Sequence, residues 1–139
     1  MRDGQLHLLL VDDDEIDREV LVRCLRPHRH HFTVTTTTDA SEALHILGGA
    51  AGHRRLPRPY AIVLELYLPG MDGFAFLQAL RQDPDLRAST VFVLTGSARE
   101  QDRVRAAAYP IAGYWVKDEL DAQCTQLIQW LEAYRVQVR

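Results

Sequence analysis

Charged and hydroxyl side chains follow several apolar runs of the sequence, at the points where strands would end. Asp12 and Asp13 follow the first run, Glu65 stands near the end of the third, and Thr95 and Lys117 close the last two. Two or three carboxylates with no cysteine or histidine among them form a hard oxygen site that suits Mg²⁺ and partial hydration. The simpler interpretation is that the acidic run only caps a helix, which Asp14 can do alone.

Lys117 has support from the composition of the chain. Lysine and arginine together number sixteen, and reading along the sequence shows fifteen arginines and this one lysine. An ammonium on a flexible stem is a compact point charge, and the planar guanidinium of arginine does not replace it. The retained lysine therefore favours a charge-recognition role for Lys117.

Five runs rich in aliphatic or β-branched residues alternate with amphipathic stretches, as expected of βαβ units and a parallel sheet. We therefore predict one α/β domain over residues 1–139, a flavodoxin-like (βα)5 doubly wound sheet with strand order 2-1-3-4-5. That order places a site at the carboxyl ends of the first and third strands, so the polar groups should converge on one rim. The expected strands are Leu6 to Val11, Phe32 to Thr37, Tyr60 to Leu66, Thr90 to Thr95 and Tyr114 to Lys117.

Helical spacing of apolar residues predicts five helices between and after these strands. Asp14 should cap the first and Asp39 the second, and Asp118 is a candidate cap for the last. The expected ranges are about 14–26, 39–47, 74–82, 98–108 and 119–135, with an exposed loop over 48–59.

Size and charge exclude several classes of function. At 139 residues, the chain has room for one sizeable core and none for an added DNA-binding output domain. The net charge is −3 with dispersed basic residues, so we expect no nucleic-acid partner. No apolar run approaches a membrane span. Cys24 and Cys124 fall on the apolar stripes of the first and last expected helices, which indicates inert core residues in a reducing compartment rather than a disulfide or metal pair. We expect a cytoplasmic protein that does not act at membranes.

These residues, together with Leu68-Pro69-Gly70-Met71-Asp72-Gly73, resemble the receiver domain of bacterial two-component response regulators, in its stand-alone chemotaxis type. The resemblance aligns Glu65 with the aspartate that accepts phosphate. It implies a Mg²⁺ site, weakened by the substitution, on Asp12, Asp13, Glu65 and the backbone carbonyl of Tyr67.

The same resemblance implies roles for three further residues. Thr95 matches the switch hydroxyl that hydrogen-bonds the phosphoryl group, and Tyr114 matches the aromatic side chain whose rotamer reports the state of the site. Lys117 matches the lysine that pairs with the acceptor, so we predict an ion pair between Lys117 and Glu65. A strand-terminal threonine and a strand tyrosine are otherwise ordinary, so neither identifies the family alone.

Glutamate at the acceptor position leaves three hypotheses for the function. The first is a non-enzymatic receiver that works without phosphorylation, with Glu65 as a partial mimic of the active state. The second is a response regulator that takes phosphate from a histidine kinase, and the third is a pure interaction module on a receiver fold. A glutamate carboxylate lies about 1 Å farther out, an error that can cost about 10²-fold in rate, which favours the first hypothesis.

The resemblance also implies the class of partner. A sensor histidine kinase or another signalling protein would bind the surface of the fourth helix, fifth strand and fifth helix. Here that surface includes Arg99, Arg103 and Tyr114, and Trp130 and Tyr134 widen the apolar arc of the last helix. A homodimer through this surface is a further expectation.

Overall fold

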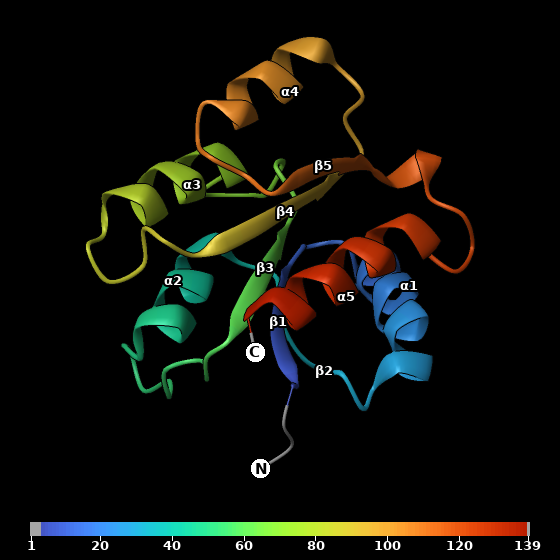
Figure 1. Ribbon diagram of the computed structural model, residues 1–139. Coiled ribbons are helices and arrows are strands. Elements are labelled where there is room, and N and C mark those ends of the chain that lie inside the picture. The colour runs from blue at the N-terminus through green and yellow to red at the C-terminus, as the bar shows by residue number, and fades with distance from the viewer. Residues whose placement is uncertain (1–3, 139) are drawn as a thin grey trace.

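A computed structural model describes residues 4–138 as a five-stranded parallel sheet with helices on both faces (Figure 1). The strand order is β2-β1-β3-β4-β5, as predicted from the alternation of apolar runs and amphipathic stretches. The strands are β1 (Leu6–Val11), β2 (Phe32–Thr37), β3 (Tyr60–Leu64), β4 (Thr90–Thr95) and β5 (Gly113–Val116).

Between and after the strands, residues 4–138 form five α-helices and two short 3₁₀ turns. The helices are α1 (Glu15–Leu25), α2 (Ala40–Gly48), α3 (Gly73–Gln82), α4 (Glu100–Ala107) and α5 (Thr125–Val138), and the 3₁₀ turns are η1 (Arg26–His28) and η2 (Lys117–Glu119). Asp14 and Asp39 cap α1 and α2 as predicted, because their side chains accept hydrogen bonds from first-turn N–H groups. No helix among residues 4–138 is long and apolar enough to cross a membrane.

The two faces of the sheet carry separate apolar cores. Because side chains alternate along a strand, Leu8 and Leu10 of β1 pack toward α1 and α5, whereas Leu9 and Val11 pack toward α2 and α3. Figure 1 shows α1 and α5 together on one side of the sheet, with α2, α3 and α4 on the other. Covering both faces explains why β3 is buried at all five positions.

Parallel pairing brings the carboxyl ends of the central strands to one edge. Val11 of β1 lies opposite Leu64 of β3, and the backbone N–H of Glu65 donates to the carbonyl of Val11 at 3.0 Å. β4 and β5 end in register at Thr95 and Val116. The polar residues that follow these strands therefore share one rim, as the strand order requires.

The last helix begins later than predicted. α5 begins at Thr125 rather than near Glu119, and Asp118 does not cap it but lies within η2. Instead, the Asp121 carboxylate accepts from the N–H of Thr125 at 2.7 Å, and Cys124 has a left-handed backbone with φ of 51°. A non-glycine residue in that conformation separates the preceding turn from the helix, and apolar spacing alone does not reveal it.

The fourth helix is also shorter than predicted, beginning at Glu100 instead of Ala98. The preceding residues form a loop in which the Ser97 side chain accepts from the N–H of Arg99 at 3.3 Å. A serine that bonds nearby backbone competes with helix formation, which accounts for the shift.

Gly73 fixes the approach of α3 to the rim, which gives a stability prediction. A Cβ added there would lie 2.6 Å from the Cα of Leu66 and 2.7 Å from the carbonyl oxygen of Glu65. Both are backbone atoms, so Gly73→Ala should lower the free energy of unfolding by about 1–3 kcal/mol in urea titrations. Gly48→Ala is the matched control, because its Cβ meets nothing within 4 Å, and it should be neutral or stabilising. Equal losses in both variants would contradict this account.

Candidate functional site

The centre of the rim is the ammonium group of Lys117, which contacts carboxylates from three segments. Its Nζ lies 2.8 Å from Asp12 after β1, 2.7 Å from Asp17 on α1 and 2.8 Å from Glu65 after β3. The predicted pairing of Lys117 with Glu65 is thus present. The structure adds Asp17, which was not predicted from the sequence.

The two oxygens of Glu65 have separate partners. Oε1 accepts from Lys117, whereas Oε2 accepts from the backbone N–H groups of Leu66 at 2.7 Å and Tyr67 at 3.2 Å. The hydroxyl of Thr95 also donates to Oε2. The side chain is buried, so these four donors replace the water that a carboxylate otherwise requires.

The pKa values of Asp12, Glu65 and Lys117 depend on burial and on how the carboxylates share the charge of the lysine. Burial would raise the pKa of Glu65, but hydrogen bonds from Lys117 and Thr95 outweigh it and the pKa is lowered. For Asp12, burial dominates over its hydrogen bond with Lys117, so its pKa is raised. Burial opposes the charge of Lys117, yet bonds to the three carboxylates raise its pKa above the ordinary value. The ammonium stays charged, and of the two buried carboxylates Asp12 takes a proton more readily than Glu65.

The residues expected to hold Mg²⁺ are only partly gathered. Asp12 and Glu65 meet at Lys117, whereas Asp13 is exposed, and no group of three or more His, Cys, Asp or Glu among residues 4–138 is arranged to hold a metal. Oδ1 of Asp12 accepts from the Asp14 N–H at 3.0 Å, and its Oδ2 faces Lys117. Because Lys117 already contacts Asp12 and Glu65 and the expected third carboxylate is exposed, the residues as arranged fit a divalent cation poorly.

Tyr67 belongs to a second polar cluster, which links the β3–α3 loop to α4. Its hydroxyl donates to the buried Asp102 carboxylate, at 2.8 and 2.7 Å from the two oxygens. Ser97 also donates to Asp102, and Arg99 pairs with Asp102 at 3.2 Å while contacting the Tyr67 hydroxyl. The bond from Ser97 is the chief cause that lowers the pKa of Asp102. This cluster was not predicted from the sequence.

Tyr114 joins this second cluster to β5. Its hydroxyl donates to the carbonyl of Ser97 at 3.0 Å, and the Arg103 guanidinium lies 4.5 Å from the centre of its ring. Ser97 is two residues beyond Thr95, so a short backbone segment connects the partner of Glu65 to the partner of Tyr114. The switch roles predicted for Thr95, Tyr114 and Lys117 stay predictions, although all three lie at or beside the rim.

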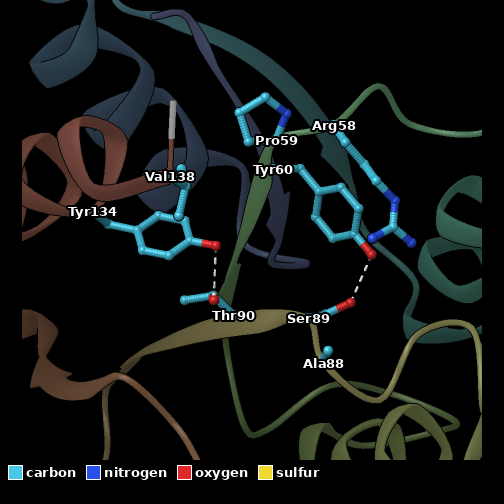
Figure 2. Close-up of a pocket in the computed structure, with 8 residues that line it drawn as sticks. All are labelled: Arg58, Pro59, Tyr60, Ala88, Ser89, Thr90, Tyr134 and Val138. Atoms are coloured by element: carbon cyan, nitrogen blue, oxygen red, sulfur yellow. Dashed lines mark hydrogen bonds between the residues drawn. The ribbon is translucent and has the colours of Figure 1, made fainter.

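Two hollows lie at opposite ends of the sheet. One, of about 470 Å³, is beside the rim and is lined by Glu65, Thr95 and the loop from Gly96 to Arg99. The other, of about 400 Å³, is at the amino ends of β3 and β4 (Figure 2). There Tyr60 shares a 2.6 Å hydrogen bond with Ser89, and Thr90 donates to Tyr134 at 2.9 Å. Of these two hollows, the first reaches the charged residues of the rim.

Residues 8–129 match the family model of the response regulator receiver domain. The chain belongs to the response regulator receiver family. It is 28% identical over 127 residues to response regulator Rcp1 of Synechocystis, covering 91% of this chain and 86% of Rcp1. It spans about half the length of another relative, the two-component response regulator ORR6 of Oryza sativa, covering 51% of it. Receiver domains are modules of two-component signalling.

Solved structures agree with the fold of this receiver. The Mn²⁺-bound form of Rcp1 superposes with a TM-score of 0.79 at 27% identity, covering 92% of each chain. The phosphorylated cyanobacterial phytochrome response regulator RcpA gives a TM-score of 0.78 at 28% identity, covering 94% of this chain and 91% of that one.

Removing Lys117 should destabilise the receiver more than removing any single partner of it. Lys117→Met would leave the buried Asp12 and Glu65 facing each other without a counter-charge, lowering the free energy of unfolding by about 3–5 kcal/mol at neutral pH. Asp17→Asn is the control, because its side chain is 37% exposed and its pair should contribute about 1 kcal/mol or less. Chemical denaturation measures the free energy of unfolding of both variants. Similar losses would show that the burial of Asp12 and Glu65 does not add to the cost of removing Lys117.

The lowered pKa of Glu65 predicts a loss of stability in acid. A carboxyl whose pKa is lower in the folded state stabilises the fold above its unfolded pKa, and this contribution is lost as pH falls through the folded pKa. Between neutral pH and about pH 3, the receiver should therefore lose more stability than its Glu65→Gln variant. The exposed Glu19→Gln variant should follow the unmodified receiver. If the stabilities of the receiver and of Glu65→Gln change in parallel with pH, the ionisation of Glu65 does not contribute to the loss of stability in acid.

Proposed function

We propose that this chain is an atypical receiver that signals without phosphorylation, with Glu65 at the acceptor position as a partial mimic of the active state. The observation that carries the proposal is the dual contact of the Glu65 carboxylate, which holds Lys117 through one oxygen and Thr95 through the other. The family resemblance assigns these two residues to sensing the phosphoryl group. Here both have a carboxylate partner in the unmodified chain.

The bonding of Glu65 also supports a low reactivity toward phosphodonors. Phosphoryl transfer needs an acceptor oxygen in line with the phosphorus, and catalysis by such sites is positioning and charge neutralisation. Oε2 already accepts three hydrogen bonds and Oε1 faces the ammonium. To attack phosphorus, an oxygen of Glu65 would have to give up these hydrogen bonds. It would also lie about 1 Å from the position that an aspartate oxygen takes.

The mimicry is incomplete, because a carboxylate carries one negative charge where a phosphoryl group carries about two. Asp12 and Asp17 share Lys117 with Glu65, so the ammonium is not committed to Glu65 alone. We therefore propose a receiver held between the resting and active arrangements, whose partner selects between them.

Metal binding is proposed to be weak in this receiver. A relative of known structure, Rcp1, was solved in its Mn²⁺-bound form. In this chain, the ammonium of Lys117 takes the place of a cation between Asp12 and Glu65. An aspartate at position 65 would be shorter and would free that space for Mg²⁺.

The proposed output surface is formed by α4, β5 and α5. The contacts from Thr95 through Ser97 to Tyr114 lead from the rim to β5, and Asp102 ties the same loop to α4. Apolar side chains are exposed on this part of the molecule, with Trp130 at 50% and Val104 at 61%. We propose that a sensor histidine kinase or another cytoplasmic signalling protein binds there; the homodimer expected from the sequence stays a prediction.

A conventional response regulator is the second candidate, favoured by the phosphorylated structure of RcpA. Under this alternative, a histidine kinase would supply phosphate to Glu65 or to a neighbouring aspartate. The two candidates differ in whether the unmodified chain takes up phosphate at all.

Incubation with acetyl phosphate and Mg²⁺, followed by intact mass measurement, tests the proposal. The unmodified chain should gain no phosphate, whereas Glu65→Asp should gain one and should react at least about 10²-fold faster, because the shorter carboxylate restores the in-line position. Glu19→Asp, the same change at an exposed site of α1, should behave like the unmodified chain.

Stoichiometric phosphate on the unmodified chain would overturn the proposal in favour of the conventional regulator. Phosphate on neither the unmodified chain nor Glu65→Asp would show that the rim has lost more than its acceptor, as expected for a pure interaction module. Omitting Mg²⁺ from the Glu65→Asp reaction should abolish the gain.

A further inference from the structure

Two cysteine thiols that the site does not use meet between α1 and the start of α5. Cys24 lies on α1 and Cys124 directly precedes α5, one hundred residues later, yet their sulfur atoms are 2.8 Å apart. Both are free thiols and both are buried. The sequence analysis placed each on a helix as a separate core residue; Cys124 is not on a helix, and the two are neighbours.

The separation of the thiols is short enough for a covalent bond. A disulfide has an S–S length of about 2.03–2.05 Å, so the two sulfur atoms need to approach by less than about 1 Å. The Sγ of Cys24 otherwise donates only to the carbonyl of Ala122 at 3.4 Å, a weak bond that oxidation can replace.

The backbone conformation of Cys124 indicates that its thiol is held in place. Its φ of 51° is the left-handed conformation, which a residue with a side chain keeps only when its surroundings impose it. Its carbonyl accepts from Ile128 at 3.0 Å, so Cys124 occupies the cap position of α5, yet its side chain is 1% exposed and points into the core instead of capping. A capping role of the side chain therefore does not explain why a cysteine stands at this position.

A hollow beside Cys124 is large enough to hold a small oxidant. A hollow of about 230 Å³ between α1 and the η2–α5 connection is lined by Cys124 together with Leu21, Leu94 and Lys117. Hydrogen peroxide is not much larger than water, whose share of liquid volume is about 30 Å³, so it fits this space. Burial raises the pKa of the Cys124 thiol to about 12, so its thiolate is scarce at neutral pH and the reaction should be slow.

We propose that Cys24 and Cys124 form a reversible disulfide when a peroxide oxidises the chain, and that this bond ties α1 to the start of α5. One thiolate attacks a peroxide oxygen, so that an S–O bond forms, the O–O bond breaks and hydroxide leaves with the thiol proton as water. The second sulfur then attacks the sulfenic acid, so that the S–S bond forms and a second water leaves. Two electrons pass from the sulfur atoms to the peroxide.

The position of the cross-link gives it a consequence for the rim. Asp17 stands seven residues before Cys24, and Lys117 stands seven residues before Cys124, so the ion pair and the thiol pair join the same two segments. The disulfide would fix α1 against the connection that carries Lys117. It would do so whether or not Glu65 accepts phosphate, so the proposal does not depend on the proposed signalling mode.

The test is oxidation of the reduced full chain with hydrogen peroxide, followed by intact mass under non-reducing conditions. The chain contains two cysteines, so a monomer that loses two hydrogen atoms has formed this bond. The thermal midpoint should rise by roughly 5–10 °C, because the bond closes a long loop of the unfolded chain, and dithiothreitol should reverse both changes.

Cys24→Ala supplies the matched control. In that variant, peroxide should add oxygen to Cys124 without loss of hydrogen, and the thermal midpoint should not rise. If Cys24→Ala fails to fold, the loss of two hydrogen atoms from the unmodified chain and its reversal by dithiothreitol still test the proposal. Oxygen added to both cysteines, disulfide-linked dimers or no reaction of the unmodified chain would each overturn the proposal, while the phosphate experiment on Glu65 would be unaffected.

Discussion

One ammonium group shared among three carboxylates is the constraint on which the rim depends. Asp12, Asp17 and Glu65 come from separate segments, and Lys117 is the cation that all three contact. Three negative charges face one positive charge, and burial, which the hydrogen bond with Lys117 only partly offsets, raises the pKa of Asp12. The sheet supplies the positions, but the lysine makes it tolerable to bring buried carboxylates so close together.

Glu65 couples this charge balance to the surface of the molecule. Its second oxygen holds Thr95, and the loop after Thr95 bonds to Tyr114 and, through Ser97, to Asp102 on α4. A change in the charge or length of residue 65 therefore acts on two groups of contacts at once. One group joins α1 to the segment after β5, and the other joins the β4–α4 loop to α4. Such paired contacts are what a two-state signalling module needs.

Much of the fold could be predicted from the sequence, because apolar runs and their alternation with amphipathic stretches determine strand order and the shared rim. The pairing of Lys117 with Glu65 was instead implied by the resemblance to receiver domains. Asp17 was missed because a helix residue in the first turn is expected to face solvent, and only tertiary packing turns it inward. The start of α5 was misplaced because Cys124 adopts a left-handed backbone, which the spacing of apolar residues does not reveal.

The solitary lysine makes the rim chemically distinguishable from the rest of the surface. All other cationic side chains except the histidines are guanidinium groups, which amine-acylating reagents do not attack readily. In the folded state the Lys117 side chain is only 15% exposed and its pKa is raised, so it lacks the neutral amine that acylation requires. The rate at which Lys117 is acylated therefore reports the fraction of time that the ammonium is released from its carboxylates, which is the population of the open rim.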